Sequence, residues 1–168
     1  MFNVKKLAFG AAMLAASAVC FAAPKVEIVT SEGNIVVNLN EKAAPTTVAN
    51  FVKYAKEGFY NGTIFHRVIN NFMIQGGGFD RNLHQKSTHA PIKLEDKNGL
   101  KNTVGTIAMA RTNNPDSATS QFFINLKDND FLNGTSTKDG YAVFGEVVTG
   151  MDVVRKIGRA PTGSKGFM

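Results

Sequence analysis

The chain has 168 residues, with 19 lysines and arginines against 13 aspartates and glutamates, and 43% of its residues are hydrophobic. This length and hydrophobic content suit a single domain with its own core. The positive charge is spread along the chain without a long basic block, so it indicates solubility and argues against nucleic-acid binding.

The first 23 residues are typical of a cleaved secretory signal peptide. The basic pair Lys5-Lys6 precedes an apolar run over residues 7–21, which is short for a membrane span, and cleavage is expected after Ala22 or Ala23. An uncleaved anchor is one alternative. A lipid anchor at Cys20 is another, although the preceding valine fits such a site poorly. Cleavage would leave a mature domain, residues 24–168, that contains no cysteine. Its hydrophobic core must therefore stabilise the domain without disulfide bonds.

The mature chain begins with the pattern of a β-hairpin followed by a helix. Apolar residues alternate from Val26 to Leu39 on either side of a polar turn at 31–34. Pro45 is a typical first helical residue, apolar residues then recur every three or four positions, and Gly58 is a natural stop. We expect this helix to pack one apolar stripe against the sheet.

A second hairpin is predicted over residues 64–75, with its turn at Asn70-Asn71. Three glycines, 76–78, follow it and allow another segment to approach the backbone closely. Residues 80–102 are polar and irregular, so they predict a long loop, which is either a functional rim or mobile.

The rest of the chain predicts three more strands and a short helix. The strands fall at 105–110, 120–125 and 141–148, and the helix at 151–157. Phe131-Leu132 is expected in a short helical turn or loop. With seven or so strands and two helices, this pattern is typical of a mainly β protein whose antiparallel barrel closes on itself and is capped by the helices.

The hairpin at 64–75 carries the residues of greatest chemical interest. It sets a permanent cation, Arg67, beside Phe72 and Met73 and the amide of Gln75. Such a surface can bind the apolar part of a ligand while the guanidinium contacts the ligand's polar edge. The plainer interpretation is a solvated arginine and a core Phe-Met pair. No metal-ligand spacing, catalytic triad or nucleotide loop is found, so neither a metal nor a cofactor is expected.

Five segments, in this order and spacing, make the chain resemble the cyclophilin-type peptidyl-prolyl cis-trans isomerases. They are FHRVINNFMIQGGGF, GTIAMAR, SQFFINL, FLNG and YAVFGEVV, and the resemblance runs from about Val26 to Ile157. It implies an eight-stranded antiparallel barrel capped by two helices, with the site on its outer face. Together with the signal peptide, it is closest to the periplasmic cyclophilins of Gram-negative bacteria, so a periplasmic location is expected.

The resemblance also implies the site residues. Arg67 matches the family's catalytic arginine. The positions that match residues contacting the bound peptide are Phe72, Met73, Gln75, Ala110, Arg111, Gln121, Phe123, Phe131, Leu132 and Tyr141. Three of them differ from the best-known eukaryotic pattern, where tryptophan, histidine and asparagine stand in place of Phe131, Tyr141 and Arg111. Phenylalanine lacks the indole N–H, so weak or no cyclosporin binding is expected.

The expected activity is isomerisation of Xaa-Pro bonds during the folding of secreted proteins. Rotation breaks the amide resonance and leaves a lone pair on the proline nitrogen, to which Arg67 can donate more strongly in the twisted state. The expected partners are proline-containing polypeptides and unfolded secreted proteins, and the default state is a monomer. The alternatives are a proline-motif binding module or chaperone on the same scaffold, and a structural β-domain.

One expected element is missing from the pattern at the end of the chain. Family members continue beyond the second helix into a last barrel strand, whereas residues 161–168 show no apolar alternation. We therefore expect either a truncated product or a barrel that is left open with unpaired edges, and a thermal stability below that of a full-length relative.

Overall fold

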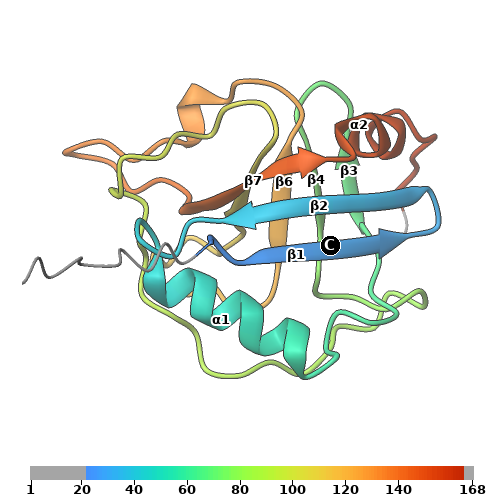
Figure 1. The fold of residues 1–168 in the computed structure, drawn as a ribbon, viewed down its shortest axis with the longest axis horizontal. Helices are drawn as coiled ribbons and strands as arrows, with labels where there is room; N and C mark the ends of the chain where they lie inside the picture. The colour runs from blue at the N-terminus through green and yellow to red at the C-terminus, as the bar shows by residue number, and fades with distance from the viewer. Residues whose placement is uncertain (1–21, 165–168) are drawn as a thin grey trace, which may run out of the picture.

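The computed structural model describes residues 22–164, which form one curled antiparallel sheet and two helices (Figure 1). The strands are β1 Lys25–Thr30, β2 Gly33–Leu39, β3 Arg67–Ile69, β4 Met73–Gly76, β5 Thr106–Met109, β6 Phe122–Asn125 and β7 Val143–Thr149. The helices are α1 Pro45–Lys56 and α2 Met151–Gly158, and η1 is a 3-10 turn at Asp130–Leu132. Residues 1–21, which hold most of the predicted signal peptide and Cys20, and residues 165–168 lie outside the described part, so the signal peptide and its cleavage stay predictions.

The sheet is a seven-stranded half-barrel in the described residues. Its strand order is β1-β2-β7-β5-β6-β4-β3, and every neighbouring pair is antiparallel. Within residues 22–164, β1 and β3 stand at the two ends of this order. The mainly β architecture with two helices is therefore confirmed, while closure into the expected eight-stranded barrel is not seen in this part of the chain.

Alternation along the central strands separates two apolar clusters, one on each face of the sheet. The inner cluster fills the half-barrel and includes Phe51 of α1 together with Ile74, Ile107, Ile124 and Phe144. The outer cluster is smaller, and its buried members are Met73, Ala108, Phe123, Leu132 and Val143. Because successive side chains of a strand point to opposite faces, the same strands build the core and expose a second apolar surface.

Helix α1 forms where its proline and apolar stripe predict, but a distant residue caps it. Ala44 precedes the helix and offers no side-chain cap. The Glu95 carboxylate accepts hydrogen bonds from the Thr46 and Thr47 amides, at 3.3 and 2.6 Å. A carboxylate at a helix N-terminus satisfies free N–H groups and complements the helix dipole. The 80–102 loop is thus irregular as predicted, yet tied to the fold.

The predicted strand at residues 64–69 is shorter than expected. Strand β3 begins at Arg67, so His66 lies just before the strand and not inside it. The Ile64 amide donates instead to the Phe79 carbonyl, at 3.0 Å, which takes this segment out of the β3–β4 ladder. The turn is where it was predicted, and Asn71 adopts a left-handed φ of 56°.

Helix α2 lies at the end of the sheet where β7 terminates, across from α1 (Figure 1). It packs on β2, β3 and β4 through its buried Val154 and Ile157. Neither helix within residues 22–164 is long and apolar enough to cross a membrane.

Candidate active site

The site is organised by one row of paired residues that crosses five strands. Arg67 on β3 pairs with Gln75 on β4, and Gln75 pairs with Phe123 on β6. Phe123 pairs with Ala108 on β5, and Ala108 pairs with Val143 on β7. Directly paired residues of an antiparallel sheet share a face. The register therefore places the Arg67 guanidinium on the same face as the outer apolar cluster.

A pocket of about 120 Å³ opens on this face. Nine of the eleven predicted site residues line it, namely Arg67, Phe72, Met73, Gln75, Ala110, Arg111, Phe123, Leu132 and Tyr141. Of the two others, Gln121 is hydrogen-bonded to Gln75 and Phe131 stacks on Phe72. The structure therefore brings the predicted set together, although the role of each residue stays a prediction.

Buried apolar side chains form the floor of the pocket, and Arg67, Gln75 and Arg111 add polar groups to its lining. Met73, Phe123 and Leu132 have 1%, 4% and 9% of their surface exposed. Phe131 is 59% exposed and stacks on Phe72, with ring centroids 5.6 Å apart. The Tyr141 ring meets Phe123 edge to face, at 5.7 Å. A small ring such as that of proline can be held here by contact with aromatic and aliphatic carbon.

Arg67 supplies an uncompensated positive charge at the rim. Its side chain is exposed, and no carboxylate lies within ion-pair distance of it in the described residues. Its nearest polar neighbour is Gln75, whose Oε1 accepts from Arg67 Nη1 at 3.5 Å. A guanidinium without an acid partner retains most of its donors for a ligand.

Gln75 in turn is held by Gln121, and a glycine makes this possible. Gln75 Nε2 donates to Gln121 Oε1 at 3.0 Å. A Cβ at Gly78 would lie 2.5 Å from Gln121 Cγ, and one at Gly76 would lie 2.9 Å from the Ile64 carbonyl oxygen. The close approach that the three glycines predicted is confirmed.

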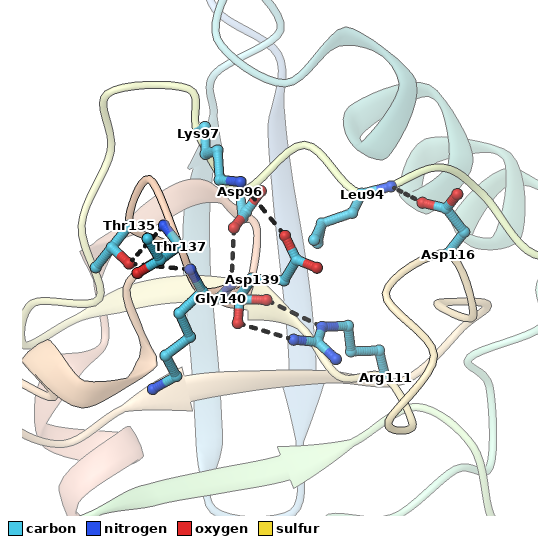
Figure 2. Close-up of polar contacts among 10 residues, drawn as sticks. Leu94, Asp96, Lys97, Arg111, Asp116, Thr135, Thr137, Asp139 and Gly140 are labelled. Carbon is cyan, nitrogen blue, oxygen red and sulfur yellow. Dashed lines mark hydrogen bonds and ion pairs between the residues drawn. The ribbon is translucent and has the colours of Figure 1, made fainter.

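Arg111 turns its side chain onto the neighbouring loop (Figure 2). Its guanidinium donates to the carbonyls of Thr112, Asp139 and Gly140, at 2.9, 3.2 and 2.9 Å. The guanidinium carbon also lies 4.7 Å from the centroid of the Tyr141 ring. Arg111 therefore builds one wall of the pocket by holding Tyr141 and the loop before it.

Sequence reasoning missed three buried amides that support the pocket from behind. Asn102 Nδ2 donates to the carbonyls of Leu132 and Tyr141, each at 3.3 Å. Asn129 Nδ2 donates to the Phe72 carbonyl at 3.0 Å, and Asn125 links the other two amides. An asparagine in a loop or at a strand end is usually a turn residue, so local patterns carry no signal for this role.

His66 adjoins the site without entering the pocket. Its ring packs on Phe79, with centroids 4.5 Å apart, and its buried Nδ1 has no hydrogen-bond partner among the described residues. Burial lowers the pKa of His66 below its ordinary value, and the charge of Arg67 also lowers it, while the nearby Ile64 backbone opposes the shift. The lowered pKa favours the neutral form of His66, so its ring contributes less positive charge beside Arg67 than a solvent-exposed histidine would.

The other two histidines lie on the surface. His84 Nδ1 lies 3.7 Å from Asp80 Oδ2, and His89 Nε2 lies 2.7 Å from Glu57 Oε2. Among residues 22–164, no three acidic, histidine or cysteine side chains come together as metal ligands would.

Comparisons with known proteins agree with this geometry. The family model for cyclophilin type peptidyl-prolyl cis-trans isomerases matches residues 25–167. A peptidyl-prolyl cis-trans isomerase of Acinetobacter baylyi is 58% identical over 164 residues, covering 98% of this chain and 87% of that protein. Peptidyl-prolyl cis-trans isomerase B of Escherichia coli is 61% identical over 141 residues, covering 82% and 86%.

Solved structures show the same fold. A cyclophilin type peptidyl-prolyl cis-trans isomerase of Cryptosporidium parvum, crystallised in the presence of the dipeptide Ala-Pro, superposes with a TM-score of 0.71. It is 27% identical in sequence, and the match covers 83% of this chain and 88% of that one.

Proposed function

The chain belongs to the cyclophilin-type peptidyl-prolyl cis-trans isomerase family, and from this premise we propose how its pocket accelerates rotation about an Xaa-Pro bond. Peptidyl-prolyl cis-trans isomerase activity is the function of the relatives it matches and of this chain. The proline ring occupies the apolar pocket, and Arg67 stands at its rim. The observation that carries the proposal is the row across the sheet, which places an unpaired guanidinium beside that pocket.

The proposed chemistry needs no covalent step. Amide resonance gives the prolyl bond a barrier of about 20 kcal/mol. Twisting the bond removes the resonance and makes the proline nitrogen a hydrogen-bond acceptor. Arg67 donates to this nitrogen in the twisted state more strongly than in the planar one, and Gln75 keeps the guanidinium oriented. Each ~1.4 kcal/mol of such selective stabilisation accelerates rotation about tenfold.

Isomerisation of a short Ala-Pro peptide, followed with wild-type protein and Arg67→Ala, tests the proposal. Loss of one charge-assisted hydrogen bond, about 1.5–3 kcal/mol, predicts a fall in kcat/KM of roughly ten- to a hundredfold. Turnover equal to wild type in the variant would contradict the role of Arg67. Peptide binding without turnover by folded wild-type protein would favour a proline-motif binding module or chaperone instead.

We further propose that the clients are proline-containing segments of unfolded secreted proteins, met in the periplasm by a monomer. The signal-like pattern of residues 1–23 supports this location. Cell fractionation and the N-terminal sequence of the mature protein test it, since a cytoplasmic protein that begins at Met1 would contradict it. Phe131 supports weak or no cyclosporin binding, which titration with the drug measures directly.

We also propose that the half-barrel is the main part of an eight-stranded closed barrel. The support is the position of β1 and β3 at the two ends of the strand order, where each leaves one edge available for pairing. Hydrogen exchange at the outer edge of β1 tests this. Slow exchange supports closure by a further strand, and fast exchange along the whole edge contradicts it.

A further inference from the structure

Two opposite charges hold the Asp139–Gly140 segment from its two sides (Figure 2). On one side, the Gly140 amide donates to Asp96 Oδ2 at 2.7 Å. On the other, Arg111 Nε donates to the Gly140 carbonyl at 2.9 Å and Nη2 donates to the Asp139 carbonyl at 3.2 Å. Hydrogen bonds with one charged partner are stronger than neutral ones. The segment is therefore clamped between a carboxylate and a guanidinium that lie 44 and 29 residues from Gly140 in sequence.

Two glycines leave room for this clamp. A Cβ at Gly134 would collide with Asp96 Oδ2 and Cγ, and a Cβ at Gly140 would collide with the backbone of Leu132 and Gly134. Neither glycine has a φ in the left-handed region, so backbone conformation does not require glycine at these positions. Gly134 thus makes room for the Asp96 carboxylate, and Gly140 allows its own segment to lie close to the backbone of residues 132–134.

Tyr141, the residue that follows the clamped Asp139–Gly140 segment, lines the pocket. The Tyr141 amide donates to the Leu132 carbonyl at 2.9 Å, which joins the two pocket residues. The centroid of the Tyr141 ring lies 4.7 Å from the guanidinium carbon of Arg111 and 5.7 Å from the centroid of the Phe123 ring. A shift of Gly140 must therefore move the Tyr141 backbone and release Arg111, which both line the pocket.

From these contacts we propose that Asp96 is a positioning residue for substrate binding. It fixes Gly140, and through Gly140 it sets where Arg111 and Tyr141 close the pocket around the proline ring. Asp96 touches neither the pocket nor Arg67, so it governs affinity for the peptide and leaves the rotation step to Arg67. This inference rests on the proposed site and adds a residue from the 80–102 loop to it.

The chain offers a matched control for Asp96. Asp116 also accepts one backbone hydrogen bond in this region, from the Leu94 amide at 2.9 Å (Figure 2). In the described residues no hydrogen bond joins Asp116 to the clamped segment or to Tyr141. Asp116→Ala therefore removes the same kind of bond without releasing the pocket wall.

The experiment compares wild type, Asp96→Ala, Asp96→Asn and Asp116→Ala, with an Ala-Pro peptide as the probe. KM and kcat are measured together with the NMR signals of the Tyr141 ring and the melting temperature. We expect Asp96→Ala to raise KM about three- to tenfold with little change in kcat, and to shift the Tyr141 signals. Asp96→Asn keeps an acceptor oxygen and recovers most of the affinity, while Asp116→Ala matches wild type in KM and in the ring signals.

An unchanged KM and unchanged Tyr141 signals in Asp96→Ala would overturn the inference, and so would an equal rise in KM for Asp116→Ala. If Asp96→Ala does not fold, Gly134→Ala serves as the second variant, because its added Cβ displaces the Asp96 carboxylate without removing it. Gly134→Ala must then raise KM in the same way, and an unchanged KM in this variant also overturns the inference. If wild-type protein binds the peptide without turnover, the proposed chemistry fails, and the dissociation constant then serves in place of KM.

Discussion

Gly78 provides a test of the site that leaves the backbone conformation intact. Its φ is not among the left-handed ones, so alanine is compatible with the chain path and slightly restricts the unfolded state. The added Cβ, however, would lie 2.5 Å from Gln121 Cγ and 2.7 Å from Cδ. Gly78→Ala must therefore push the Gln121 side chain away from its place beside Gln75.

The expected cost follows from one hydrogen bond. Displacing Gln121 removes its 3.0 Å bond to Gln75, the residue that we propose orients Arg67. A neutral hydrogen bond contributes about 0.5–1.5 kcal/mol. Since ~1.4 kcal/mol corresponds to a factor of ten in rate, kcat/KM should fall roughly two- to tenfold while the fold is retained.

Peptide isomerisation measured in a double-mutant cycle decides whether the effect passes through Arg67. Gly78→Ala should cost little further activity in the Arg67→Ala background, because the group it misplaces is already absent. Gly163→Ala is the control, since nothing lies within 4 Å of its Cβ position. No loss of activity in Gly78→Ala, or the same loss with and without Arg67, would refute the reasoning.

Three further predictions concern the site, the core and pH. Arg67→Lys keeps the positive charge but lacks the planar guanidinium with its several N–H donors, so kcat/KM should fall about tenfold, which is less than in Arg67→Ala. Equal losses in the two variants would contradict a contribution from charge. The Phe51 side chain is 1% exposed and packs on three aromatic rings, with centroid distances of 5.2–5.4 Å. Phe51→Ala should therefore lower the free energy of unfolding, measured in urea, by about 3–5 kcal/mol, and a loss below ~1 kcal/mol would contradict its place in the core. The folded-state pKa of His66 lies below its ordinary value of 6.5, so the unfolded chain binds this proton more tightly. The free energy of unfolding should therefore keep its full value above pH ~6.5 and fall as the pH drops towards the folded-state pKa of His66. His66→Gln should flatten this pH dependence in thermal melts across that range, and a slope that the substitution leaves unchanged would contradict the prediction.

Local patterns in the sequence determined most of the secondary structure and the centre of the site. Strand alternation, Pro45 at the start of α1 and the Asn70-Asn71 turn act over a few neighbouring residues, so their effects can be read without the fold. For the same reason one hairpin sufficed to point to Arg67, Phe72, Met73 and Gln75. The family resemblance supplied the more distant members, such as Phe123, Leu132 and Tyr141, which no local pattern connects.

Only the tertiary structure decided how those residues are held. Register places Phe123 in the same row as Arg67, and a slip of one residue would move it into the inner core. Three contacts join segments 30 to 48 residues apart: the helix cap from Glu95, the amide of Asn102 behind the pocket and the carboxylate of Asp96 at Gly140. Such contacts depend on loop conformations that the whole fold determines. A single polar residue in an irregular loop belongs to no periodic pattern, so the sequence alone does not identify its partner.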